Sequence, residues 1–152
     1  MACPVDVHAH HVGIFVSDID RSIAWWEEML GFKKMFENTF FLPDYGHARM
    51  AWVKKDGFYI ELYDFPGLET DNSKYWKTYG TKHVSLWVDD KGQFDTLRDY
   101  LKAKGVQVVV EAVHPPEKTQ KPIPNKVMFV LDPDGTSVEI QESYTPGEYG
   151  KA

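Results

Sequence analysis

The chain is poor in three features that would mark particular classes of protein: cysteine, positive charge and long apolar runs. One cysteine, Cys3, in 152 residues excludes an internal disulfide. The 17 Lys and Arg are outnumbered by 23 Asp and Glu, and a net charge of −6 argues against nucleic acid or an anionic membrane as a main partner. No apolar run approaches the ~18 residues of a membrane span, and the first residues lack the basic and apolar regions of a signal peptide. We therefore expect a cytoplasmic protein without nucleic-acid or membrane partners.

Aromatic residues, in contrast, are plentiful. Five Trp, eight Tyr and nine Phe make up 14% of the chain, and rings of this kind fill either a core or a ligand cavity. The length predicts one compact domain, or two small halves that share a core, at ~150 residues per domain.

Two stretches 72 residues apart are similar to each other. Residues 11–18 read HVGIFVSD and residues 83–90 read HVSLWVDD, so four of the eight positions are identical. Alternating apolar residues predict a half-buried strand in each stretch. A helical pattern follows each strand and ends at a glycine, Gly31 or Gly105, as a left-handed C-cap requires.

Three more strands are expected after each helix. The runs are 33–41, 47–54 and 58–63 in the first half and 106–110, 126–131 and 136–141 in the second. The predicted fold class is α+β, with two tandem βαβββ modules that form a cup-shaped mixed sheet. We place the first module at 8–64, a linker at 65–79, the second module at 80–142 and a C-terminal tail at 143–152, all within one domain.

Strand alternation brings four potential metal ligands onto corresponding faces. If Val12, Ile14 and Val16 face the helix, the face turned away from it carries His11 from the first strand and Glu61 from the last. The second copy places His83 and Glu139 in the same way. Imidazole and carboxylate ligands together suit Zn²⁺, Ni²⁺, Co²⁺, Mn²⁺ or Fe²⁺.

The two glutamates allow another role, and the remaining histidines are not expected to be ligands. The glutamates could instead form ion pairs with Lys82 or Lys126 on the sheet. His10 is expected to point to the face opposite His11, and His8, His47 and His114 are expected to have surface or capping roles.

The duplicated strands, the histidine on each first strand and the segment DPDGTSVEI closely resemble the vicinal oxygen chelate superfamily, which includes glyoxalases, bleomycin-resistance proteins and dioxygenases. The similarity covers about residues 8–142. It implies paired βαβββ modules around one divalent metal, usually in a homodimer. Glyoxalase-I-like members use all four ligand positions, which here are His11, Glu61, His83 and Glu139.

The resemblance also bears on the substrate. At the two positions where small bacterial glyoxalase I enzymes hold glutathione carboxylates, this chain has Phe15 and Phe65, which offer no donor to an anion. The predicted substrate-binding residues are mostly aromatic, with one hydroxyl: Phe15, Tyr59, Tyr63, Phe65, Ser85 and Trp87. This lining favours a small, moderately apolar oxygenated substrate over glutathione.

We therefore predict a glyoxalase-like lyase, isomerase or epimerase that depends on Ni, Co, Zn or Mn and acts by proton transfer. The substrate would be a small carbonyl compound chelated through vicinal oxygens. Glu139 or Glu61 would serve as the catalytic base. The alternatives are a non-haem Fe²⁺ dioxygenase of the extradiol type and a metal-free drug- or metabolite-binding protein. Whether one chain or a dimer supplies the four ligands is open at this point.

Overall fold

The computed structural model describes residues 5, 7–68, 79–88, 91–113 and 126–142. The chain divides into two compact units, Met1–Thr70 and Asp71–Ala152, and each is considered by itself. The expected loop at 114–125, the tail at 143–152 and most of the linker lie outside the described residues. Within the described residues, no helix is long and apolar enough to cross a membrane.

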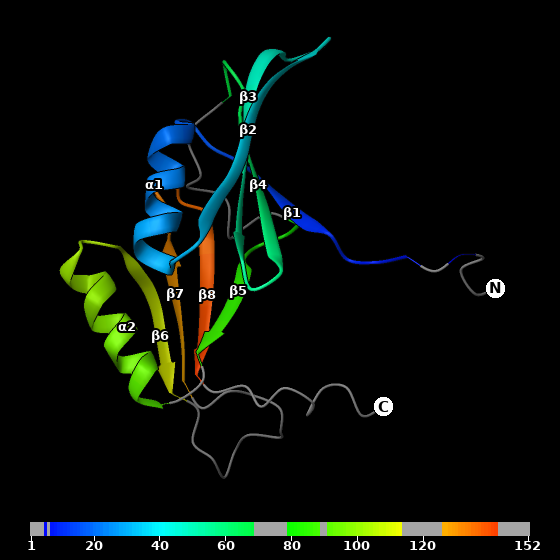
Figure 1. The fold of residues 1–152 in the computed structure, drawn as a ribbon. Helices are drawn as coiled ribbons and strands as arrows, with labels where there is room; N and C mark the ends of the chain where they lie inside the picture. The colour runs from blue at the N-terminus through cyan, green and yellow to red at the C-terminus, as the bar shows by residue number, and fades with distance from the viewer. Residues whose placement is uncertain (1–4, 6, 69–78, 89–90, 114–125, 143–152) are drawn as a thin grey trace. The chain divides into compact units, whose positions relative to one another are not determined.

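The first unit is a four-stranded sheet with one helix against it (Figure 1). Its elements are β1 (His11–Phe15), α1 (Ile19–Leu30), β2 (Lys33–Leu42), β3 (Gly46–Lys55) and β4 (Phe58–Asp64). The strand order is β1-β4-β3-β2, with β1 parallel to β4 and the other pairs antiparallel. The parallel β1–β4 pair places His11 and Glu61 on neighbouring strands.

Local signals in the sequence explain where α1 begins and ends. The Asp18 carboxylate caps the helix by accepting a hydrogen bond from the backbone N–H of Arg21 at 2.9 Å. Gly31 closes it with a φ of 70°, a left-handed conformation that favours glycine. The apolar side of α1 buries Ile19, Ile23 and Trp26 against the sheet.

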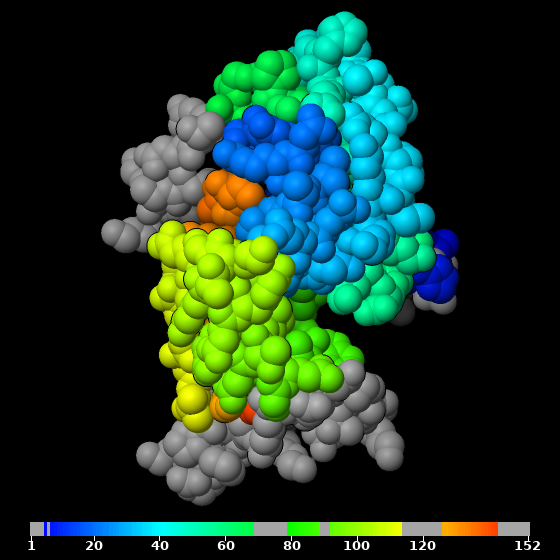
Figure 2. Space-filling model, turned by 60° about the vertical axis from the view of Figure 1, so that its left-hand side comes forward, coloured from blue at the N-terminus to red at the C-terminus, as the bar shows by residue number. Residues whose placement is uncertain are grey.

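The second unit repeats this arrangement. Its elements are β5 (Val84–Val88), α2 (Lys91–Ala103), β6 (Val108–Val113), β7 (Lys126–Leu131) and β8 (Ser137–Glu142), in the strand order β5-β8-β7-β6. Phe94 and Leu101 of α2 are buried, and Figure 2 shows α2 in yellow-green on the surface of this unit. Gly105 has a φ of 78° just beyond α2, as its sequence position predicts.

The prediction of two βαβββ modules is confirmed. The two modules also share an irregularity. The edge strands β2 and β6 each contain a register shift near their start, between Lys34 and Phe36 in β2 and between Val108 and Val110 in β6. The strand expected at 106–110 begins and ends later, at Val108–Val113. The backbone N–H of Val106 instead bonds to the Leu101 carbonyl and, with the left-handed Gly105, forms the C-terminal cap of α2.

The turn between β7 and β8 contains a buried carboxylate, that of Asp132. Its Oδ1 accepts the backbone N–H groups of Asp134 and Thr136, at 3.0 and 2.7 Å. Its Oδ2 is buried and meets no hydrogen-bond donor within the described residues. Burial outweighs the two backbone hydrogen bonds and raises the pKa of Asp132 from 3.8 to about 6.

Replacing Asp132 with Asn is expected to raise the free energy of unfolding at pH 7, by roughly 1–3 kcal/mol. Because the folded-state pKa lies above the unfolded one, the charge destabilises the folded protein at pH 7. This cost shrinks as the pH falls through 6 and vanishes below 3.8. The advantage of the variant should therefore disappear between pH 7 and pH 4 in urea unfolding curves. Asp44→Asn, which removes the same charge from an exposed turn of the first unit, is the control, and equal pH dependence in both variants would contradict this account.

Candidate functional site

The first histidine–carboxylate pair lies on the face of the β1–β4 pair that is turned away from α1. His11 Nε2 lies 2.9 Å from Glu61 Oε2. On β4, Ile60 and Leu62 are fully buried beneath the helix, so alternation directs Glu61 to the other face. The histidine is more accessible, with 33% of its side chain exposed against 9% for the glutamate.

Trp52 and Tyr63 both interact with the Glu61 carboxylate. Trp52 lies opposite Glu61 in the β3–β4 register, and its indole Nε1 donates a hydrogen bond to Glu61 Oε1 at 3.0 Å. Burial and the neighbouring Glu61 carboxylate together raise the pKa of Tyr63 to about 12. The phenol therefore stays protonated at neutral pH.

The second pair occupies the corresponding place in the second unit. His83 Nε2 lies 3.4 Å from Glu139 Oε2, and the Gln141 side-chain amide donates to that same oxygen at 3.0 Å. Val138 and Ile140, on either side of Glu139, are buried. Lys126, considered from the sequence as an ion-pair partner of Glu61 or Glu139, pairs with other carboxylates. Its ammonium lies 2.9 Å from Asp95 and 3.9 Å from Glu142.

The spacing within each pair suits two ligands of one metal ion. Bonds of ~2.1 Å place two ligand atoms about 3.0 Å apart at a right angle and about 3.4 Å apart at a tetrahedral angle. The observed separations are 2.9 and 3.4 Å. Among the described residues, no three His, Cys, Asp or Glu side chains gather closely enough to hold a metal. Each unit therefore supplies a pair of potential ligands.

The expectation for His10 is wrong. Its ring Nδ1 lies 2.7 Å from His11 Nδ1, and the ring stacks on Tyr59 with centroids 5.8 Å apart. His10 precedes β1, so the alternation of the strand does not fix its direction. His47 is exposed and packs against Phe41, His8 is exposed, and His114 lies outside the described residues.

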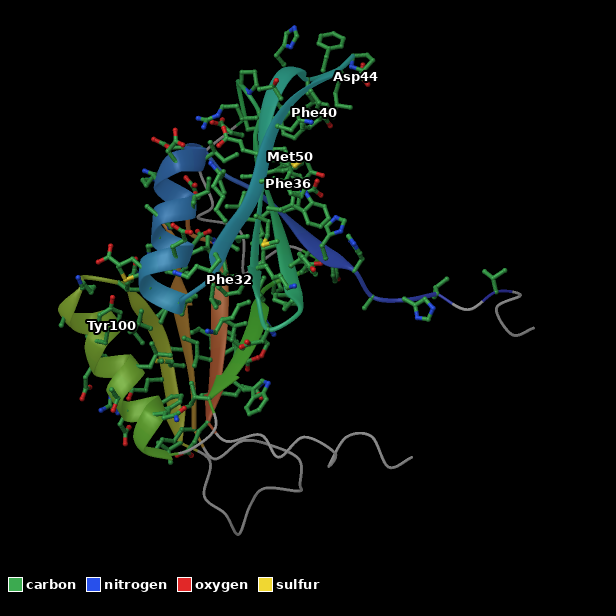
Figure 3. The ribbon with its side chains drawn as sticks, viewed as in Figure 1. Phe32, Phe36, Phe40, Asp44, Met50 and Tyr100 are labelled. Carbon is green, nitrogen blue, oxygen red and sulfur yellow. The ribbon has the colours of Figure 1, made fainter. Side chains whose placement is uncertain are left out.

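Aromatic rings continue along the same face of the first unit. Phe65 is buried and packs against Phe15, Phe40, Tyr45 and Tyr63, with ring centroids 5.2–5.8 Å apart. Sequence analysis identified three of these rings and missed Phe40 and Tyr45, because their contact with Phe65 depends on the long β2–β3 hairpin. Figure 3 shows Phe36, Met50 and Phe40 following one another along this hairpin toward Asp44.

The remaining predicted substrate-binding residues lie close to the two pairs. Tyr59 is half-buried beside His10 and Trp52. Ser85 is exposed and lies opposite Glu139 in the β5–β8 register. Trp87 lies opposite Gln141 and is 44% exposed. These positions match the alternation expected from the sequence, and their role in binding stays a prediction.

Comparison with known proteins identifies the family. The profile of the Glyoxalase/Bleomycin resistance protein/Dioxygenase superfamily matches residues 8–140. A probable chloroplastic lactoylglutathione lyase from Arabidopsis thaliana is 32% identical over 133 residues, which cover 87% of this chain and 35% of that longer protein. The chain belongs to this superfamily.

Solved structures share the fold at low sequence identity. A glyoxalase family protein from Bacillus cereus superposes with a TM-score of 0.74 at 19% identity, covering 95% of this chain and 99% of that one. A mutant of the fosfomycin resistance protein FosX from Listeria monocytogenes, complexed with Mn(II) and 1S,2S-dihydroxypropylphosphonic acid, gives a TM-score of 0.67 at 15% identity. That match covers 97% of this chain and all of the FosX chain. At these sequence identities the similarity establishes the shared fold.

Proposed function

We propose that this protein is a metal-dependent enzyme of the glyoxalase-like class that transfers a proton on a small carbonyl substrate with vicinal oxygens. The observation that carries the proposal is the spacing of the two pairs, His11–Glu61 at 2.9 Å and His83–Glu139 at 3.4 Å. Two histidines and two glutamates form a donor set that suits Ni²⁺, Co²⁺, Zn²⁺ or Mn²⁺.

These four side chains are the proposed metal ligands. When bound, the metal would act as a Lewis acid that stabilises negative charge on a substrate oxygen. The His11 and His83 Nε2 atoms must be unprotonated to serve as ligands.

A carboxylate then moves the substrate proton. Glu139 is the proposed base, because Glu61 is held on its second oxygen by Trp52 and is more deeply buried. Glu139 would take the proton from the carbon beside the carbonyl and return it to the neighbouring carbon or to the opposite face. This transfer gives isomerisation, epimerisation or glyoxalase-type chemistry without a redox cofactor.

The rings that pack around Phe65 favour a substrate that carries an apolar or aromatic group. Phe15 is 55% exposed and packs on Phe65 and Tyr63, so the described residues at this part of the surface offer ring faces. A carboxylate-rich compound such as glutathione would lose its hydration there without gaining an ion pair. We propose that the substrate is not a glutathione adduct.

Metal analysis of protein purified without added metal or chelator tests the proposal. We expect about one Ni, Co, Zn or Mn per chain, measured by inductively coupled plasma mass spectrometry. Stoichiometric iron together with oxygen uptake on addition of catechols would instead support the dioxygenase alternative. A protein that contains no metal and takes none up on titration would contradict both enzyme functions and leave a binding protein.

A further inference from the structure

We propose that Trp52 and His10 are positioning residues that hold the His11–Glu61 pair ready for the metal, so that this pair forms the fixed part of the ligand set. In the second pair a phenyl ring takes the place of the indole, and Glu139 is the carboxylate that can leave the metal. This inference rests on the proposed function and assigns a division of labour between the two modules.

The contact between Trp52 and Glu61 is the first observation behind the proposal. The indole N–H donates to Oε1, while Oε2 faces His11. One carboxylate oxygen is thus anchored and the other is directed toward the histidine. Trp52 is itself held in place, because its ring stacks on Phe36 with centroids 5.5 Å apart. Outer contacts of this kind orient metal ligands in many proteins.

The second module provides an internal comparison. Phe129 lies opposite Glu139 in the β7–β8 register, just as Trp52 lies opposite Glu61 in β3–β4. Both rings pack on the histidine of their own pair, Trp52 on His11 at 4.7 Å and Phe129 on His83 at 5.4 Å. A phenyl ring keeps the packing but has no N–H to donate. The difference between the modules at this position is therefore a hydrogen bond.

The remaining contacts of Glu139 agree with a less constrained carboxylate. Gln141 donates to Oε2, the same oxygen that faces His83, so this amide competes for the atom expected to bind the metal. The pair is also wider, at 3.4 Å against 2.9 Å, and the glutamate is more exposed, at 14% of its side chain against 9%.

His10 supplies the second positioning contact. With the two Nδ1 atoms of His10 and His11 2.7 Å apart, one must donate and the other accept. His11 can offer the Nε2 lone pair to a metal when its own Nδ1 carries the proton and donates to His10. Stacking on Tyr59 holds the His10 ring where it can accept that bond. When a metal takes Nε2 in place of the Glu61 contact, His11 would carry its proton on Nδ1, and His10 would accept that N–H and hold the ring in this orientation.

The test measures Ni²⁺ affinity by competition with a chromogenic chelator, using the metal-stripped full chain. Trp52→Phe should bind Ni²⁺ about 10–100-fold more weakly than wild type, the range found when outer contacts of metal ligands are removed. Trp25→Phe is the matched control, because it makes the same substitution on α1 of the same module, where the indole packs on Trp26. A cooperative melting transition of each metal-free variant establishes that it folds, and the loss of the Trp52 hydrogen bond is expected to lower the melting temperature of Trp52→Phe.

Two further comparisons keep the proposal testable if Trp52→Phe does not fold. His10→Ala should also weaken Ni²⁺ binding, and Glu61→Gln should weaken it more than Glu139→Gln. Wild-type affinity in folded Trp52→Phe or in His10→Ala, or equal losses in the two glutamine variants, would overturn the positioning role. A wild-type protein that binds none of Ni²⁺, Co²⁺, Zn²⁺ or Mn²⁺ would contradict the proposed function itself, so the two failures are distinguishable.

Discussion

Glu139→Gln is expected to lower the rate of proton transfer by about 10²–10⁴-fold, because glutamine cannot accept the substrate proton. The amide has nearly the shape of the carboxylate, and Glu139 is only partly buried, so the fold should persist. The assay is solvent deuterium incorporation next to the carbonyl of aryl-substituted 2-hydroxy ketones, followed by NMR. The circular dichroism spectrum of the variant should match that of wild type.

Glu28→Gln provides the control for this experiment, because Glu28 is exposed on α1 and the substitution removes the same charge. It should exchange deuterium at the wild-type rate. Full activity in Glu139→Gln would rule out Glu139 as the base. If Glu61→Gln lost exchange while retaining wild-type metal affinity, the base would instead be Glu61.

His11→Ala is expected to remove most of the stabilisation that a divalent metal gives to the folded protein. A ligand at 100 times its dissociation constant stabilises the folded state by about 2.7 kcal/mol, which shifts the melting temperature upward. Loss of one of the four proposed ligands should raise the dissociation constant far enough that the same Ni²⁺ concentration produces little shift. Differential scanning fluorimetry with and without Ni²⁺, after treatment with EDTA, measures this directly.

His47→Ala is the matched control, since His47 lies in the same module, is exposed and contacts the Phe41 ring. It should keep the full Ni²⁺-dependent shift, and His83→Ala should lose it. If His11→Ala and His47→Ala responded to Ni²⁺ alike, His11 would not be a ligand.

Much of the fold could be predicted from local patterns. The duplicated segments at 11–18 and 83–90 indicated two copies of one module, and both copies have the predicted order of elements. Alternation in β4 and β8 was sufficient to direct Glu61 and Glu139 away from the helices, since buried apolar neighbours on both sides leave one direction for the charge. The strand register then brought each glutamate to its histidine.

The surroundings of the two pairs could not be predicted in this way. His10 lies just outside β1, where strand alternation gives no direction, and its contacts depend on Tyr59 from β4. Phe40 and Tyr45 reach Phe65 because of the length and course of the β2–β3 hairpin. Such contacts join residues that are distant in sequence, and no local pattern encodes them.

The sequence by itself therefore determined the duplicated fold and the four candidate ligands, because both follow from periodicities of a few residues. The tertiary structure alone decided how the two pairs differ. It places an indole N–H from Trp52 on Glu61 and a phenyl ring from Phe129 opposite Glu139. The physical reason is that strand register aligns residues from separate strands, and only this alignment determines which side chain can donate a hydrogen bond to each carboxylate.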